Sequence, residues 1–377
     1  MRKLSRRSFV KTTSAAAVAA TVAPVLAESA LARVFVGSGT ANGILAYDWD
    51  PATGQLTAAG VAAAISTVDW LTYSPGHWFL FAACEVDSFQ GKATGEVASF
   101  RVRKGALTPL SAQNSAAKGT CHVAIDRTGR VLLSADYGGG SAASFLVTEG
   151  KLSPAVWTEH YTVHGPNKER QEAAHAHFCS FSPDNRFVYI NDLGGDMIHI
   201  YRLDATTAQL TGAGAYHAKP GDGPRTLHFH PNGHTAYGMN ELSSSVDVLE
   251  WKRADGSLTP VARIDLHPDP SKAPNTGCDT VITRDGRFVY FAHRGDDFLV
   301  GFRADVKTGA LTPLRRFSCG GKTPRNFVLD PTERWMLVAN QNSSWISVFA
   351  RNPETGELAD HGKNFDAATP MRILFAS

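Results

Sequence analysis

The chain has 377 residues, of which 43% are hydrophobic and 19% are charged, so it is long enough to bury a large core. Its 37 lysines and arginines nearly balance its 35 aspartates and glutamates, and this balance gives no reason to expect nucleic acid or a charged membrane surface as a partner. The five cysteines are an odd number, widely scattered, with no Cys-X-X-Cys pair, which predicts buried free thiols and no metal site.

Residues 1–32 have the pattern of an export signal. The segment SRRSFVK at residues 5–11 is typical of twin-arginine signals, and an apolar stretch rich in Ala and Val follows it. Cleavage fits after Ala27 or after Ala32, of which we favour Ala32. A lone transmembrane anchor is the alternative, but the stretch is short and rich in Ala. We therefore predict export of the folded protein by the twin-arginine machinery to the periplasm or beyond, without stable membrane insertion.

A short phrase, Gly-X-Leu-Thr in its best-preserved form, recurs along the rest of the chain. GALTPL stands at both 105–110 and 309–314, and the copies are spaced by about 45–58 residues, a period typical of propeller repeats. The seven copies begin at Gly54, Gly105, Gly150, Ala208, Gly256, Gly309 and Gly356. Each follows an apolar segment and a polar turn, and glycine supplies the positive φ of a tight hairpin. The phrase therefore marks the last hairpin of a repeated unit.

A second landmark precedes each copy, with turn residues followed by strong strand formers, as in SPDNRFVYIND at 182–192. Each unit thus has four antiparallel strands, and seven such units predict a seven-bladed β-propeller over residues 33–377. The chain enters at a second strand, VFVG at 34–37. It ends with TPMRILF at 369–375, which matches a first strand, TPRNFVL at 323–329. The last strand is therefore expected to complete the N-terminal blade and close the ring.

Two positions in each unit meet at one rim of the central channel, namely the start of the first strand and the end of the second. The first set comprises Asp69, Cys121, His177, Arg225, Cys278, Arg325 and Met371. The second set comprises Gly39, Glu85, Tyr137, Leu193, Glu241, Arg294 and Gln341. Both vary in residue type, whereas the position before the second set repeats small polar residues, which we interpret as turn caps: Ser38, Asp136, Asp192, Asn240 and Asn340.

The sequence therefore predicts a pocket in which His177, Arg225, Glu241, Arg294 and Arg325 gather, with Glu85 opposite them. Arginine binds carboxylate or phosphate through paired hydrogen bonds, and histidine is the usual proton carrier near neutral pH. We expect an anionic or oxygen-rich small molecule to bind there.

Long segments are expected to form a wall or lid over this rim, namely 86–95, 158–174 and 266–276. The segment 158–174 carries His160, His164, Lys168 and Arg170, for which a solvated loop is the favoured interpretation. His175 follows it directly. We expect His175 and Gln341 to contact substrate, along with Arg325 and Glu85.

Three segments carry a resemblance to a known family. GDGPRTLHFHPNGHTAYGMNELSSSVDVLEW, HAHFCSFSPDNRFVYINDLGGDMIHIYRLD and TPRNFVLDPTERWMLVANQNSSWISVF resemble repeats of the bacterial 6-phosphogluconolactonases of the propeller type. The resemblance runs from about residue 33 to the end, and the family includes fungal carboxymuconate cyclases. It implies lactone chemistry without metal or other cofactor, and His177, Glu241, Arg225 and Arg294 as the acting groups.

These observations predict an exported lactonase that hydrolyses a sugar-derived lactone to its sugar acid. His177 would be the general base, the arginines would stabilise developing negative charge, and Glu241 would orient an arginine or a substrate hydroxyl, or share in proton transfer. Because phosphorylated sugars belong to the cytoplasm, the export signal puts a phosphate on the substrate in doubt. The alternatives are an intramolecular lyase acting on a dicarboxylic acid, and a non-enzymatic propeller that binds a protein or glycan on its rim.

Overall fold

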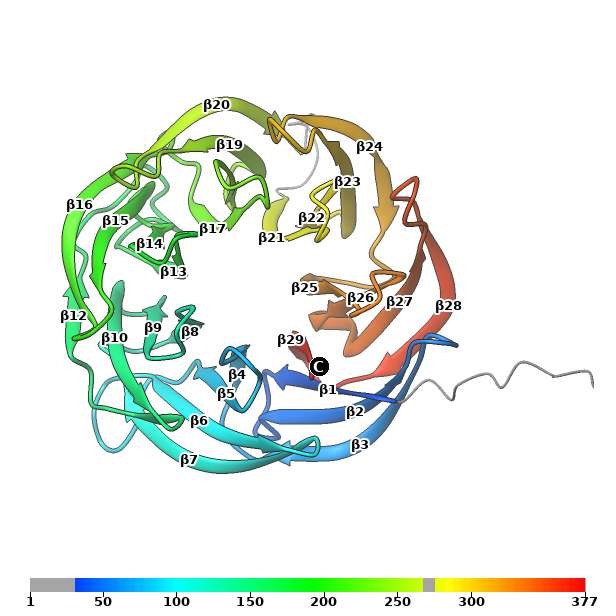
Figure 1. Ribbon diagram of the computed structural model, residues 1–377, viewed down its shortest axis with the longest axis horizontal. Helices are drawn as coiled ribbons and strands as arrows, with labels where there is room; N and C mark the ends of the chain where they lie inside the picture. The colour runs from blue at the N-terminus through cyan, green and yellow to red at the C-terminus, as the bar shows by residue number, and fades with distance from the viewer. Residues whose placement is uncertain (1–30, 267–274, 377) are drawn as a thin grey trace, which may run out of the picture.

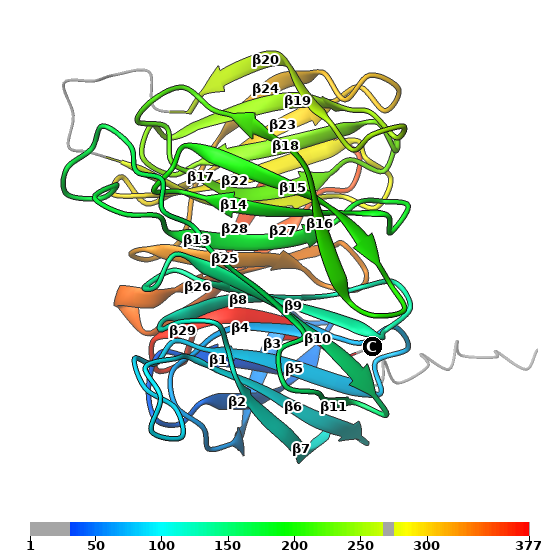
Figure 2. The same cartoon turned by 90° about the vertical axis from the view of Figure 1, so that its left-hand side faces the viewer.

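The computed structural model describes residues 31–266 and 275–376, which form seven sheets arranged in a ring around a central channel (Figure 1). Each sheet is antiparallel, and its strands follow one another from the innermost one, beside the channel, to the outermost one. Seen edge-on, the sheets stack around the ring like blades (Figure 2). The predicted seven-bladed β-propeller is confirmed.

The strand bounds repeat from blade to blade over the described residues. The innermost strands are β4 (Val68–Tyr73), β8 (Thr120–Ile125), β13 (Ala176–Phe181), β17 (Pro224–Phe229), β21 (Thr276–Ile282), β25 (Pro324–Leu329) and β29 (Pro370–Phe375). The second strands are β5 (Phe79–Cys84), β9 (Val131–Asp136), β14 (Phe187–Asp192), β18 (Thr235–Asn240), β22 (Phe288–Arg294), β26 (Trp335–Asn340) and β1 (Ala32–Ser38).

The outer half of each blade follows the same plan. The third strands are β6 (Glu96–Arg103), β10 (Ser141–Thr148), β15 (Met197–Asp204), β19 (Ser245–Trp251), β23 (Phe298–Ala304), β27 (Trp345–Arg351) and β2 (Ile44–Asp50). The outermost strands are β7 (Ala106–Asn114), β11 (Lys151–Leu152) with β12 (Trp157–His160), β16 (Gln209–His217), β20 (Leu258–Asp265), β24 (Leu311–Ser318), β28 (Leu358–Asp366) and β3 (Gln55–Ala63). A short 3₁₀ helix, η1 (Gln341–Ser343), follows β26.

The third blade differs because its outer strand is split. Both β11 and β12 pair with β10, and Pro154 lies between them. Proline has no N–H to donate, so it interrupts the pairing. The expected loop at 158–174 is therefore shorter than predicted, because Thr158–His160 belongs to β12.

The ring closes through the last strand of the chain, as predicted. β29 pairs antiparallel with β1, with Val36 opposite Ile373 and Phe35 opposite Leu374. The N-terminal blade thus combines the two ends of the described chain, and no sheet edge is left open at the closure. The predicted signal at 1–32 lies almost wholly outside the described residues, which begin at Leu31.

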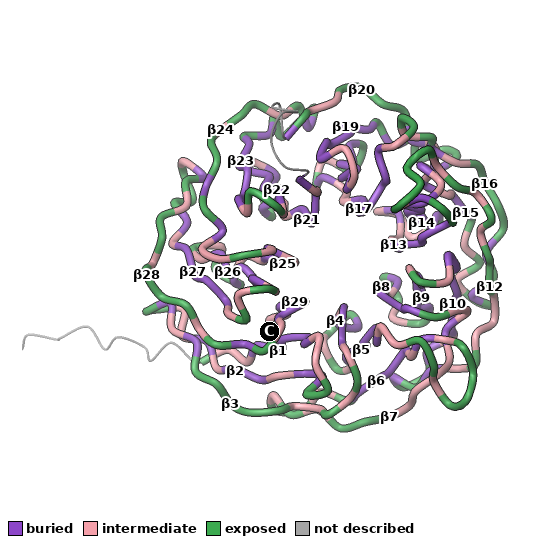
Figure 3. The backbone as a smooth tube through the Cα atoms, turned by 180° about the vertical axis from the view of Figure 1, so that it is seen from behind, coloured by how far each residue is buried: buried purple, intermediate pink, exposed green. Residues whose placement is uncertain are grey.

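The hydrophobic core lies between adjacent blades rather than within one of them. Val36 and Trp49 of the first blade, for example, pack with Leu337 and Ile346 of the seventh. Burial is concentrated on the inner strands, and the outermost strands are the exposed ones (Figure 3). All five cysteines are buried and free, as expected. Within residues 31–266 and 275–376, no helix has the length and apolar character needed to cross a bilayer.

The Gly-X-Leu-Thr phrase lies in the hairpin between the third and fourth strands, as predicted. Its first residue has positive φ in all seven copies, including Ala208 at 60° and Gly256 at 80°. A Cβ atom on Gly256 would lie 2.5 Å from Cδ1 of Phe187, the first residue of β14 in the preceding blade. For Ala208, the corresponding residue of the preceding blade is Val131, the first residue of β9. The side chain of Val131 is smaller than that of Phe187.

This difference predicts unequal effects of exchanging glycine and alanine. Gly256→Ala should lower the free energy of unfolding by about 2–4 kcal/mol, since strain at positive φ and overpacking against Phe187 add. Ala208→Gly should change it by less than about 1 kcal/mol, because relief of strain offsets the added entropy of the unfolded chain. Urea unfolding of both variants checks this. Equal destabilisation by the two substitutions would contradict it.

Candidate active site

A β-bulge at the start of each innermost strand places the first set of predicted rim residues. In β13, Ala176 pairs with Asp192 and Phe178 with Asn191, so His177 has no residue opposite it. The same register shift recurs in all seven blades. The bulges contain Asp69, Cys121, His177, Arg225, Cys278, Arg325 and Met371. A bulge redirects the side chain of its extra residue, and here the seven residues surround the channel.

The residues of the second set lie at the end of the second strands or directly after them, and backbone hydrogen bonds hold them in place. The Glu241 N–H donates to Gly223 O at 2.7 Å, and the Glu85 N–H donates to Thr67 O at 2.9 Å. The small polar residues before this set are buried and cap the rim, as interpreted. Asp192, for example, accepts a hydrogen bond of 2.8 Å from the N–H of His175, two residues before His177. The rim positions are therefore held by backbone geometry.

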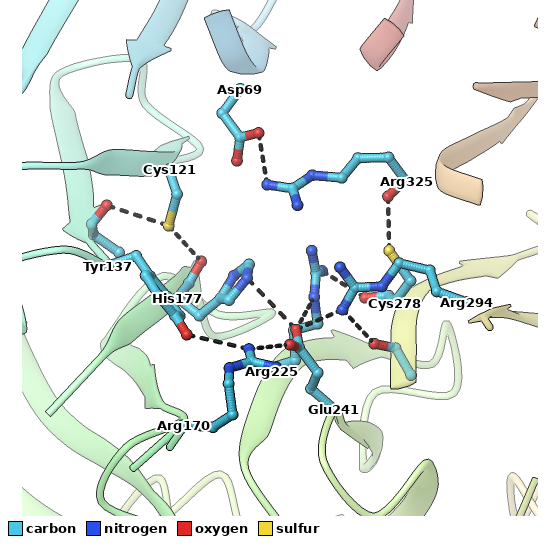
Figure 4. A network of polar contacts seen from close by, with 12 residues as sticks. Asp69, Cys121, Tyr137, Arg170, His177, Arg225, Glu241, Cys278, Arg294 and Arg325 are labelled. Carbon is cyan, nitrogen blue, oxygen red and sulfur yellow. Dashed lines mark hydrogen bonds and ion pairs between the residues drawn. The ribbon is translucent and has the colours of Figure 1, made fainter. Parts of the chain in front are cut away.

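Glu241 is the centre of the site, and three guanidinium groups contact its carboxylate (Figure 4). Arg225 Nε and one terminal nitrogen of Arg294 each lie 2.8 Å from Oε2, and a terminal nitrogen of Arg170 lies 2.6 Å from Oε1. Glu241 is 3% exposed. Burial by itself raises the pKa of this carboxyl, but the charges of Arg294 and Arg225 outweigh it and hold the pKa well below its usual range. Glu241 is therefore a permanent anion.

Arg170 is the site residue that sequence reasoning missed, since it was assigned to a solvated loop. It lies between the third and fourth blades and also donates to Tyr137 Oη at 3.2 Å. The adjacent Gln171 anchors the segment, because its buried amide donates to Leu193 O and to Asp196 Oδ1. In the sequence, only the position of Gln171 directly after the charged Arg170 could have indicated that this segment is anchored and that Arg170 belongs to the site.

A second ion pair lies across the channel, where Arg325 donates to Asp69 Oδ1 at 2.8 Å. A cavity of about 150 Å³ lies between this pair and the Glu241 cluster. Its lining residues are Glu85, Cys121, Tyr137, Arg170, His177, Glu241, Arg294 and Arg325. This volume is below the usual range for drug-sized ligands and suits a single small molecule.

The residues that follow the bulges form a layer of packed rings next to the cavity. The His122 ring lies 4.4 Å from the Trp70 ring and 3.9 Å from the Phe178 ring, measured between centroids. The Arg372 guanidinium lies 4.0 Å from the Trp70 centroid. This aromatic layer lowers the local dielectric beside the cavity, so charges inside it interact more strongly than in water.

His177 faces the cavity in its neutral form. Burial lowers the pKa of its imidazole well below the usual value, and the positive charge of Arg225 adds to the effect. Its Nε2 atom lies 3.9 Å from Glu241 Oε2, and its buried Nδ1 atom has no hydrogen-bond partner in the part of the chain that the structure describes. A neutral imidazole has one ring nitrogen that carries no proton, and this nitrogen can accept one.

Two of the expected substrate contacts lie outside the group that lines the cavity. The His175 ring stacks on Tyr137, with centroids 4.4 Å apart, and shares a hydrogen bond of 2.9 Å with Tyr137 O. Gln341 begins the 3₁₀ helix after β26. A role in substrate binding stays a prediction for both. Of the three expected lid segments, 158–174 contributes Arg170, and 266–276 lies mostly outside the described residues.

The described side chains contain no group of three or more His, Cys, Asp or Glu residues placed to share a metal ion.

A family model described as "Lactonase, 7-bladed beta-propeller" matches residues 33–375. The chain belongs to this family of β-propeller lactonases. The 6-phosphogluconolactonase of Bacillus subtilis is 33% identical to the lactonase over 340 residues, which cover 89% of this chain and 95% of that one. The 6-phosphogluconolactonase of Formosa agariphila is 32% identical over 86% of this chain and 94% of its own. The periplasmic gluconolactonase of Pseudomonas aeruginosa has a similar structure, with a TM-score of 0.87 and 31% identity, covering 92% of this chain and 99% of that one.

The lactonase is thus an enzyme that opens a cyclic ester with water, and the alternative of a non-enzymatic binding propeller is wrong. Ester hydrolysis needs a base for the water, cationic or N–H donors for the developing oxyanion, and a proton for the leaving oxygen. The cavity of the lactonase presents a neutral imidazole and several guanidinium groups around a space of suitable size for one sugar ring.

Proposed function

We propose that the lactonase is exported and hydrolyses an unphosphorylated sugar lactone without a metal ion. The main support is the placement of neutral His177 and the Glu241-bound guanidinium groups around one small cavity. The twin-arginine pattern at residues 5–11 supports export, and the Pseudomonas relative is named a periplasmic gluconolactonase.

In this proposal His177 takes a proton from water, and the resulting hydroxide attacks the lactone carbonyl. Arg294 and Arg225 stabilise the oxyanion, because fixed charges in a water-poor site act at nearly full strength. Glu241 keeps these arginines in position. It does not carry protons, since its pKa is held too low for that role. Arg325, on the opposite side of the cavity, binds substrate oxygens.

The charges in the cavity favour a neutral lactone over a phosphorylated one. The three arginines that line the cavity are already engaged, two with Glu241 and one with Asp69, and the adjacent Arg225 is also bound to Glu241. A phosphate would have to compete with a buried carboxylate for its partners. The sugar acid formed as product would carry a single negative charge, which is less than a phosphorylated product would bring into the cavity.

A lactone panel tests this proposal. Gluconolactone, galactonolactone and 6-phosphogluconolactone are offered to the mature enzyme with and without EDTA, and initial rates are corrected for uncatalysed opening. We expect faster turnover of the unphosphorylated lactones and no effect of EDTA. Preference for the phosphorylated lactone would overturn the substrate, and activity lost to EDTA and restored by a divalent cation would overturn the metal-free mechanism. Carboxymuconate in the same panel tests the intramolecular lyase alternative.

A further inference from the structure

Two carboxylates line the cavity and a third, Asp69, is bound to one of its lining arginines, and the three differ in their partners. Glu241 is bound by Arg170, Arg225 and Arg294, and Asp69 is bound by Arg325. Glu85 makes no side-chain hydrogen bond or ion pair to any residue that the structure describes, although it lines the cavity. An acidic side chain left unpaired in a cavity rich in arginine is unusual, since those arginines would be its natural partners.

Glu85 also lines the same cavity as His177. It follows β5 in the second blade, whereas His177 lies in the bulge of β13 in the fourth blade, and the third blade stands between them with Cys121 and Tyr137. A lactone in the cavity would therefore lie near two titratable groups that come from different blades. Hydrolysis needs both a proton acceptor and a proton donor, because water loses a proton and the ring oxygen gains one.

We propose that Glu85 is the general acid of this lactonase and donates a proton to the ring oxygen as the lactone opens. The inference rests on the proposed function. His177 first takes a proton from water while the hydroxide oxygen bonds to the carbonyl carbon. The bond from that carbon to the ring oxygen then breaks, and the leaving oxygen takes the Glu85 proton. The new carboxylic acid ionises, and the imidazolium returns its proton to Glu85 through solvent, which restores both groups.

The surroundings of Glu85 favour its protonated form near neutral pH. Burial and the negative charge of Asp69 raise the pKa of Glu85 to about 7, and the charges of Arg325 and Arg225 oppose the rise. Asp87, on the same loop, adds a smaller upward effect. A carboxylic acid with a pKa near the working pH is an efficient proton donor. The rate should therefore fall as pH rises through about 7, because Glu85 loses the proton that it must donate.

The test compares Glu85→Gln with a matched control, Asp87→Asn, which removes the same charge from the same loop at an exposed position. With gluconolactone, we expect Glu85→Gln to lower kcat by about 10²–10³ and to abolish the alkaline fall in rate. Asp87→Asn should keep kcat within about threefold. Glu85→Asp, which retains an acid, should recover part of the lost rate and restore the alkaline fall.

Thermal unfolding separates an acid from a structural residue. Since the folded-state pKa lies above the unfolded value of about 4.3, Glu85 destabilises the fold fully at pH 8, and this penalty disappears only when pH falls below the unfolded value. Glu85→Gln should therefore raise Tm by about 2 °C or more at pH 8 and leave it nearly unchanged at about pH 4. Wild-type enzyme that opens no lactone would refute the proposed function. Active wild type together with a Glu85→Gln variant of unchanged kcat and pH profile would refute this inference alone.

Discussion

Removal of the His177 imidazole is expected to lower kcat for lactone opening by about 10²–10⁴, with little loss of stability. The ring acts as general base in the proposed mechanism, and this range is typical for such a group. Little stability is lost because the Nδ1 atom has no partner and the hydrogen bond from Cys121 Sγ goes to the backbone oxygen of His177. Rates of His177→Ala and wild type at saturating lactone, with unfolding midpoints, provide the measurement.

The pH dependence of the wild type adds a second readout. Because the pKa of His177 lies well below its usual value, the imidazole stays neutral as pH falls below 6.5, and the rate should hold there. His217→Ala is the matched control, since this histidine is exposed on the outermost strand of the same blade. A His177→Ala rate within threefold of the control would contradict the assigned base.

Loss of the Glu241 carboxylate is expected to have the largest effect on both stability and activity. Glu241→Ala leaves Arg225 and Arg294 close together with no counter-charge, and Arg225 is only 4% exposed. Removing one partner of such a buried group costs about 3–5 kcal/mol in the free energy of unfolding. The rate should fall by 10² or more, since the guanidinium groups lose the anchor that positions them. Urea unfolding and lactone kinetics measure the two effects.

Two additional measurements test the cause. Formate is small enough to enter the space left in Glu241→Ala, so added formate should raise the unfolding midpoint of this variant more than that of wild type. The folded-state pKa of Glu241 is lowered, so its stabilisation is present above the unfolded value of about 4.3 and is lost as pH falls through the folded value. The gap between wild type and Glu241→Gln should therefore close on strong acidification. Glu250→Gln, at an exposed position of the same blade, should leave stability and rate unchanged.

Local features of the sequence were sufficient to predict the fold. Each Gly-X-Leu-Thr phrase marks a hairpin that needs a residue with positive φ. This requirement depends only on the local backbone, so Gly105 and Gly309 indicate the same kind of turn in different blades. The match between 323–329 and 369–375 predicted the closing strand in the same way. Ring closure then follows from the number of repeats, and it brings His177, Arg225, Glu241 and Arg294 together, as the alignment of the blades implied.

The tertiary structure decided how these residues are used. A bulge turns His177 and its six equivalents into the channel, and it depends on pairing with a neighbouring strand. The residue types at these positions do not reveal this pairing. Arg170 reaches Glu241 only because a buried Gln171 holds its loop between two blades. The partners of the three carboxylates are likewise set by distances across the channel, so only the folded ring distinguishes Glu241, whose pKa is lowered by its arginines, from Glu85, whose pKa is raised by burial.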